Sequence, residues 1–340
     1  MFKIISLLFI ILLNTLVGAS VAVAAGFSPE SGIIVANAVS FIPQAAGVVS
    51  ITLYKQIWLA DIMEAFIPKW SFLAAASNMD QFVDNDKINL AEAGVDPSVL
   101  INNTTYPVPF AERSDTPLEL VLDVYDTEGT VLRNAELIEL AYDKRSSVLA
   151  GHKNALLNKF SQKAIHAYAP ASDATYTPVL ATTGGNAGGF KLIKFEDILD
   201  LKTRFDDLDA PEDRTLVLAP AHFNQLAKQD LVLMKAIMQG GEKLFGFQIY
   251  TFSKTPKYNK TTGVKVAFGA ASAPTTDTMA SVAFCNSEVM RAQGTFDMFE
   301  RLKDPEQKGD IINFQMRGIA LPKRSKMIAA LYSASEEANQ

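Results

Sequence analysis

The sequence predicts an α+β fold, in which helices and strands occupy separate stretches of one chain, and three observations support this prediction. Apolar residues alternate over Leu118–Tyr125, as in a half-buried β-strand. Apolar residues recur at three-to-four spacing over residues 134–168, as in one long amphipathic helix. Short apolar runs typical of strands return near the C-terminus, at 311–319 and 327–331.

The composition is that of an ordinary globular protein. The 340 residues are enough for two compact units or one elaborated domain, and 49% of them are hydrophobic while 20% are charged. The net charge is −6 and the pI is about 5.2, whereas a protein that grips nucleic acid through its phosphates normally has a basic face. The three cations of Pro322–Lys326 we interpret as part of a solvated turn between strands.

The first 25 residues have the pattern of an export signal. Lys3 supplies a short positive region, residues 4–17 are nearly all apolar, and Ala22 and Ala24 form a small-x-small cleavage pattern. This pattern predicts an exported protein that begins near Gly26, or an anchored one if the segment is kept. Two other interpretations stand beside it, namely a start codon assigned too far upstream and a segment removed during maturation.

The next stretches predict an arm, a helix and a hairpin. Residues 26–50 are rich in small residues and poor in charge, which indicates an extended arm. The apolar spacing between Lys55 and Phe72 predicts an amphipathic helix that ends or bends at Pro68. Prolines break up the stretch that follows, and we predict a long β-hairpin over residues 87–133 with a turn at Asp126–Gly129.

The long helix begins at the good N-cap Asn134 and ends before Pro170. A glycine-rich stretch at Gly184–Gly189 then predicts a flexible loop. Helices are predicted at 192–209 and 221–233, and strands at 213–220, 244–252, 264–267, 281–285, 311–319 and 327–331.

The local motifs of common enzymes are absent from the sequence. His152 and His166 stand about 21 Å apart on the predicted helix and cannot bind one metal ion, and isolated histidines of this kind, His222 included, are usually surface or capping residues. Gly184–Gly189 lacks the lysine of a phosphate-binding loop. Cys285 lies in an apolar context that indicates a small buried residue. We therefore predict no catalytic, cofactor-binding or metal-binding residue, and no cofactor.

The order of arm, hairpin, long helix, helix-and-strand domain and returning strands resembles the HK97-fold major capsid protein of tailed bacteriophages. Three segments carry the resemblance over roughly residues 50–335: Arg214–Leu226, then Leu244–Tyr250 with Pro256, and Gly309–Ala320. The resemblance implies an HK97-type capsid fold with an N-arm, an E-loop β-hairpin, a long spine helix, a P-domain and an A-domain.

The resemblance also implies a division of the chain. Its parts are the signal-like or mis-started segment 1–25, the N-terminal arm 26–86, the E-loop 87–133, the spine helix 134–170, the connection 171–213 from P-domain to A-domain, the A-domain 214–290, and the returning P-domain strands with a polar tail 291–340.

A capsid resemblance implies a structural, non-catalytic subunit that assembles with itself, as pentamers and hexamers, into an icosahedral shell around phage double-stranded DNA. The expected location is the virion, assembled in the host cytoplasm. Scaffold, portal or decoration proteins are further expected partners, DNA contact is expected to be non-specific, and no stable membrane partner is expected. The alternatives are an exported structural or surface protein, an encapsulin-type nanocompartment shell, and an enzyme that depends on His222 or Cys285.

Overall fold

The computed structural model describes residues 66–68, 71–84, 86–92, 101–104, 106–107, 116–133, 144–240 and 243–336. All of them lie in Leu59–Gln340, the second of two compact units into which the chain divides. The signal-like segment 1–25, the arm over 26–50 and the first ten residues of the predicted long helix lie outside the described residues. Of the helix predicted between Lys55 and Phe72, the structure describes only residues 66–68 and 71–72, and the bend at Phe66–Pro68 agrees with the predicted end or bend at Pro68.

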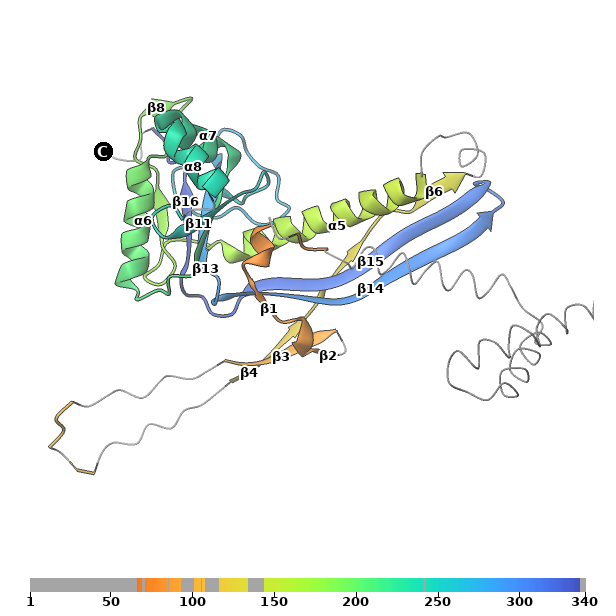
Figure 1. Ribbon diagram of the computed structural model, residues 1–340, viewed down its shortest axis with the longest axis horizontal. Helices are drawn as coiled ribbons and strands as arrows, with labels where there is room; N and C mark the ends of the chain where they lie inside the picture. Colours follow the sequence, from red (N-terminus) through yellow and green to blue (C-terminus); the bar gives the residue numbers. More distant parts are fainter. Residues whose placement is uncertain are drawn as a thin grey trace, which may run out of the picture. The chain divides into compact units, whose positions relative to one another are not determined.

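A six-stranded sheet forms the centre of one domain, and Figure 1 labels its strands β11, β13 and β16. The strand order is β11-β10-β13-β16-β7, with β12 paired to β13. β10 is parallel to β11 and β16 to β7, while the pairs that β13 makes are antiparallel. The strands are β7 Val179–Ala181, β10 Arg214–Leu218, β11 Phe247–Thr251, β12 Lys257–Asn259, β13 Asp277–Cys285 and β16 Ile328–Tyr332.

Three helices complete this domain, α6 Phe195–Asp207, α7 Pro220–Gln229 and α8 Leu231–Gly240. Each buries one apolar stripe against the sheet, through residues such as Phe205 in α6, Leu226 in α7 and Ile237 in α8. The predicted buried strand at 213–220 is confirmed, because every side chain of β10 is buried. A strand with both faces covered carries a continuous apolar run and shows no alternation.

The second large sheet is built on two long antiparallel strands, β14 Val289–Asp304 and β15 Gly309–Pro322, which we call the ribbon. The short β1 Ser77–Asn78 runs parallel to β14, and β5 Asp123–Asp126 and β6 Thr130–Arg133 both pair with β15. The long helix α5 Lys144–Tyr168 packs along β15 (Figure 1). Leu156 and Phe160 of α5 are buried, which is the expected result for the apolar face of this helix.

Smaller elements flank these two sheets. A three-stranded sheet joins β2, β3 and β4, in which Lys87 of β3 pairs with Val121 of β4. The strands of this sheet are β2 Val83–Asp84, β3 Lys87–Glu92 and β4 Thr116–Val121. A two-stranded sheet consists of β8 Asn186–Ala187 and β9 Phe190–Lys191. Two 3-10 helices are η1 Phe72–Ala74 and η2 Asp80–Phe82.

The predicted hairpin over 87–133 is wrong in its second half. β3 and β4 do form an antiparallel pair, but β5 and β6 follow one another along β15, so the chain does not reverse at Asp126–Gly129. Thr127 explains the difference, because its N–H donates to the Phe314 carbonyl (2.9 Å) and its hydroxyl accepts from the Phe314 N–H (2.9 Å). A polar stretch that looks like a turn therefore continues the pairing with β15.

Other predicted elements also differ. The helix over 221–233 is two helices, divided at the extended Asp230, whose carboxylate accepts from the Leu233 N–H at 2.9 Å. Residues 264–267 contribute one bridge to Tyr258 and no strand. The glycine-rich stretch is the tight hairpin β8–β9, in which Gly188 and Gly189 take positive φ angles, and it is not an irregular loop.

Candidate interaction surfaces

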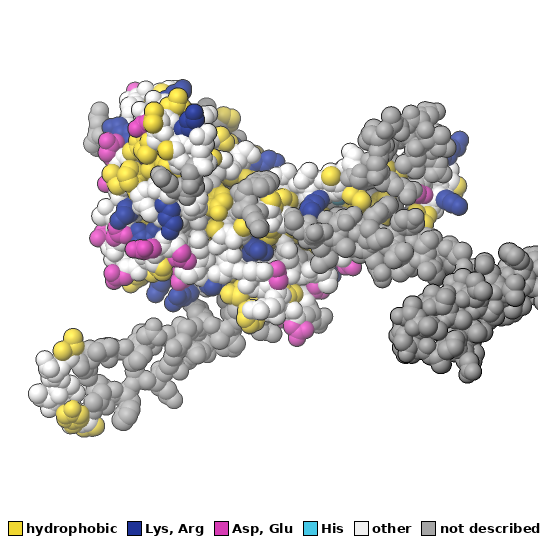
Figure 2. Space-filling model, viewed as in Figure 1, with side chains coloured by type: hydrophobic (Ala, Val, Ile, Leu, Met, Phe, Trp, Pro, Cys, Tyr) yellow, Lys and Arg dark blue, Asp and Glu magenta, His cyan; other side chains and the backbone are white. Residues whose placement is uncertain are grey.

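The excursion between β3 and β4 exposes large apolar side chains. Ile101 is 84% exposed and Tyr106 is 76% exposed, and Val121 on β4 is more than half exposed. Figure 2 shows hydrophobic atoms at the end of this excursion. Side chains as exposed as these in the described part of the chain are available to a partner.

Helix α8 exposes a second apolar surface, the α8 face, formed by Leu231, Val232, Leu233 and Met238. Met234 and Ile237 already supply the buried stripe of this helix, yet Val232 is 81% exposed and Leu231 is 69% exposed. Hydrophobic side chains gather over the α7–α8 part of the domain in Figure 2. Four large apolar side chains exposed on one short helix form an apolar patch, so the α8 face is a candidate contact surface.

The ribbon has one covered and one open face. Phe296 and Met298 of β14 are buried, and the Phe296 ring meets Phe66 edge-on at 5.3 Å between centroids. Phe299 and Leu302, further along the same strand, are about half exposed. This part of β14 therefore lacks the cover that its apolar side chains would need in an isolated protein.

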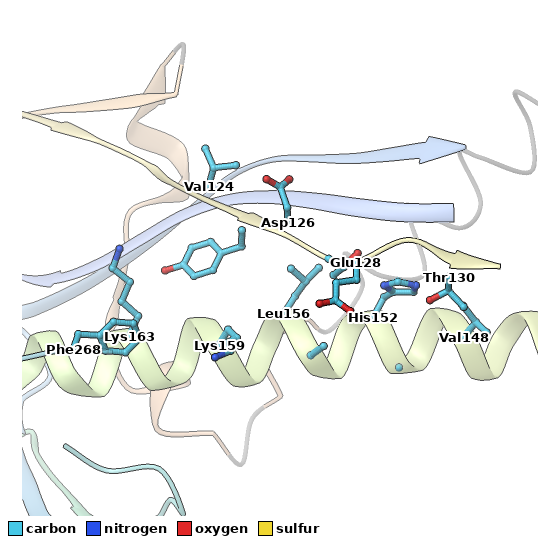
Figure 3. Close-up of a pocket in the computed structure, with 14 residues that line it drawn as sticks. Val124, Asp126, Glu128, Thr130, Val148, His152, Leu156, Lys159, Lys163 and Phe268 are labelled. Carbon is cyan, nitrogen blue, oxygen red and sulfur yellow. The ribbon is translucent and has the colours of Figure 1, made fainter. Parts of the chain in front are cut away.

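A groove of about 790 Å³ lies between α5 and the edge formed by β5 and β6 (Figure 3). Its floor is apolar, with Leu156 on the helix side and the Tyr125 ring edge-on to Phe160 at 5.8 Å. At the rim Lys163 forms an ion pair with Asp123 at 2.7 Å. Among the described strands, β5 and β6 pair only with β15, so their outer edge is open to an added extended segment.

His152 lies beside this groove and is buried, contrary to the prediction of a surface or capping residue. Its ring packs at 5.1 Å from Phe314, and its Nε2 has no hydrogen-bond partner among the described residues. Burial lowers the pKa of His152. His166 is half-buried, and its Nε2 bonds the Val266 carbonyl at 2.9 Å.

His222 is the most deeply buried of the three histidines, and the structure brings two serines to it. Its Nδ1 lies 2.7 Å from Ser281 Oγ and its Nε2 lies 2.9 Å from Ser333 Oγ. Sequence reasoning missed this arrangement, because the serines are 59 and 111 residues from His222 and no local motif connects them. Ser281 is fully buried, so its hydroxyl is not accessible to a substrate in this conformation.

Cys285 is buried, in agreement with its predicted packing role. Burial raises the pKa of its thiol to about 12, and the nearby Asp213 acts in the same direction. The thiol is therefore protonated at neutral pH and is a poor nucleophile.

Two further features bear on partners. The stretch Pro322–Lys326 is the predicted turn, between β15 and β16, and its Arg324 pairs with Glu288 at 2.8 Å while Lys323 bonds the Ser287 carbonyl at 2.8 Å. Within the described ranges, no three His, Cys, Asp or Glu side chains gather as a metal site, and none of the helices has the length and hydropathy of a membrane span.

No protein-family model matches the chain, and no curated protein matches it. Solved capsid structures do match. Against the capsid of cyanophage P-SCSP1u the identity is 17% and the TM-score 0.55, over 77% of this chain and 87% of that one. Against the capsid of Ralstonia phage GP4 the identity is 9% and the TM-score 0.55, over 79% of this chain and 90% of that one. Against the capsid of a native GTA particle the identity is 12% and the TM-score 0.55, over 77% of this chain and 89% of that one. The predicted α+β fold of HK97 type is thereby confirmed.

Proposed function

We propose that this chain is a major capsid protein, a structural subunit that assembles with itself into a closed icosahedral shell around phage double-stranded DNA. The observation that carries the proposal is the fold, which the chain shares with the capsids of cyanophage P-SCSP1u and Ralstonia phage GP4 over more than three quarters of its length. The expected location is the virion, and the expected role is structural and not catalytic.

The exposed apolar surfaces support self-assembly. A monomeric protein rarely leaves large apolar side chains exposed in several groups, whereas an obligate assembly covers them with neighbouring copies. The end of the β3–β4 excursion, the α8 face and the open face of β14 are three such groups on separate elements. Several separate contact surfaces on one subunit are what a closed shell of repeated copies requires.

The division of the chain follows from the same proposal. The segment 26–86 acts as the N-terminal arm, 87–133 as the E-loop, whose β3–β4 excursion lies over a neighbouring subunit, and 134–170 as the spine helix. The segment 171–213 connects to the A-domain 214–290, and 291–340 returns to the P-domain. Copies meet as pentamers and hexamers, with scaffold, portal or decoration proteins as further partners and only non-specific contact with DNA.

The test is to express the full chain in bacteria and to fractionate the cells. Electron microscopy of the purified material should show closed particles of uniform size from the cytoplasmic fraction. A lone monomer, or mature protein found outside the cytoplasm and beginning near Gly26, would contradict the proposal. Particles filled with another protein and free of nucleic acid would favour the nanocompartment alternative.

A paired variant makes the test specific to the excursion. Ile101→Ser combined with Tyr106→Ser should reduce the yield of closed particles at least tenfold, because both side chains would lose their covering contacts in the shell. The free energy of unfolding of the unassembled chain should change by less than about 0.5 kcal/mol, since both residues are exposed. Thr104→Ser, in the same excursion, is the matched control and should assemble normally.

A further inference from the structure

A buried polar cluster lies where α7 meets β13 and the residues that follow β16. We call it the His222 cluster, and its members are His222, Ser281 and Ser333. His222 is 1% exposed, Ser281 is fully buried and Ser333 is nearly so. The cluster ties the helix to the sheet through two side-chain hydrogen bonds, of 2.7 Å to Ser281 on β13 and 2.9 Å to Ser333.

Ser281 makes one further hydrogen bond in the cluster. Ser281 Oγ accepts a hydrogen bond from the N–H of Ala219, the residue that precedes α7, at 3.1 Å. A neutral imidazole donates from one ring nitrogen and accepts at the other, so His222 donates to one of the two serine hydroxyls and accepts from the other. The neutral imidazole therefore satisfies the cluster on both sides.

A second proton on the imidazole disrupts this pair of hydrogen bonds. Both ring nitrogens become donors, so the serine hydroxyl that had donated to the ring loses its acceptor. The new positive charge also lies in the same buried site. A hydroxyl without an acceptor and a buried charge both disfavour the packing of α7 on β13.

We propose that the His222 cluster is an acid-sensitive latch, which holds α7 on β13 and the end of β16 while the imidazole is neutral and releases the helix when it is protonated. The inference goes beyond the proposed function, because it concerns the folded chain whether or not a shell forms.

The surrounding charges do not compensate for the added proton. A cavity of about 520 Å³ adjoins His222 and Ser333, and its charged lining residues are Lys260, which follows β12, and Asp277 at the start of β13. Lys260 has the same sign as the imidazolium. Asp277 is engaged by the Ala273 N–H at 2.8 Å and by the Thr276 hydroxyl at 3.0 Å. Neither residue bonds His222.

The direction of the pH effect follows from burial. Burial lowers the pKa of His222 from 6.5 to about 4, so the unfolded chain takes up this proton before the folded chain does. The stabilisation is fully present above pH 6.5 and is lost as the pH falls from 6.5 towards 4. Linkage through this one group raises the equilibrium constant for opening about 30-fold between pH 7.5 and pH 5.

The latch lies directly before the α8 face. α7 ends at Gln229 and α8 begins at Leu231, with only Asp230 between them. Release of α7 therefore displaces the exposed apolar residues that follow it. Acid should loosen this surface before it affects the ribbon, whose strands do not contribute to the His222 cluster.

Hydrogen–deuterium exchange on the full chain, followed by peptide mass spectrometry, tests the latch at pH 7.5 and pH 5. After correction for the intrinsic exchange rate, amides of α7 should exchange about 30-fold faster at pH 5, while β14 and β15 should change little. Equal α7 protection at both pH values, or a loss of protection shared equally by the ribbon, would overturn the proposal.

Single variants then assign the effect, because the chain has only three histidines. His222→Gln keeps an amide group at this site but cannot take up a proton near neutral pH, so α7 exchange should no longer depend on pH. His152→Gln and His166→Gln are matched controls and should keep the wild-type dependence. If α7 in His222→Gln is already unprotected at pH 7.5, the wild-type chain and the two control variants still test the latch. In all three, the α7 amides must lose protection at pH 5.

Discussion

The six-stranded domain buries its apolar side chains, whereas the β3–β4 excursion leaves large apolar side chains exposed. In the domain, β10 lies between β11 and β13 and all its side chains are buried, and Leu216 and Leu218 share one core with residues of α6, α7 and α8. In the excursion, Ile101 and Tyr106 remain exposed. The comparison teaches that stability and assembly depend on different parts of one chain, so mutations can affect them separately.

The largest loss of stability is expected from a cavity in the core of the six-stranded domain. Phe247 on β11 is fully buried and meets the Phe205 ring edge-on at 5.6 Å. Phe247→Ala should lower the free energy of unfolding by about 3–5 kcal/mol, because a large apolar side chain leaves a cavity that β11 cannot collapse to fill. Urea unfolding followed by far-UV circular dichroism measures this loss.

Phe299→Ala is the matched control for this core variant, since Phe299 lies on β14 and is about half exposed. Its free energy of unfolding should change by less than about 1 kcal/mol. Equal losses from the two variants would show that the open face of β14 is buried in the folded chain, and the contrast between the regions would then be wrong.

A smaller effect is expected where β15 meets β6. A Cβ added at Gly309 would lie 2.8 Å from Arg133 Cα and even closer to the Leu132 carbonyl oxygen, and both are backbone atoms. Gly309→Ala should therefore cost about 1–3 kcal/mol, because two paired strands must separate. Thermal unfolding measures the cost.

Gly294→Ala serves as a comparison for Gly309→Ala. Its added Cβ would lie 2.6 Å from Leu122 Cδ1, which is the far end of a flexible side chain. Leu122 can change rotamer, so this variant should cost less than Gly309→Ala. The reverse order would mean that the β15–β6 pairing is looser in solution than the contact indicates.

The smallest effect on stability is expected at the α8 face. Val232→Ser removes a side chain that is 81% exposed, so the free energy of unfolding of the unassembled chain should change by less than about 0.5 kcal/mol. The yield of closed particles should nevertheless fall, because a covered apolar contact is lost. Unchanged assembly would remove the α8 face from the proposed contact surfaces.

Much of the fold could be predicted from local sequence. The buried run Leu216–Leu218, the helix at 195–207 and the long helix before Pro170 each carry a pattern that one element alone produces. Strand β14 was missed because charged residues such as Arg291 and Glu300 interrupt its apolar positions, and because its pairing with β15 is irregular between Gln293 and Phe296. Such a strand is recognised by its partner and not by its own pattern.

One candidate surface could be predicted from the sequence, and the other could not. The excursion after β3 could be expected to need a partner, since prolines and the short strands of a hairpin leave little to bury its side chains. The α8 face could not be predicted, because Val232 and Met234 are equally apolar in the sequence and only the packing of α8 decides that Met234 is buried. The His222 cluster was beyond local reasoning for the same reason.

The sequence by itself determined the α+β class, the order of the main elements and the absence of local catalytic motifs, because periodicity and residue type act over a few residues. The tertiary structure alone decided that the chain runs on along β15 through 126–129 without reversing, that α8 leaves one face open, and that Ser281 and Ser333 meet His222. Those outcomes depend on contacts between residues far apart in the chain, and the free energy of such contacts comes from burial and hydrogen-bond geometry that no short segment contains.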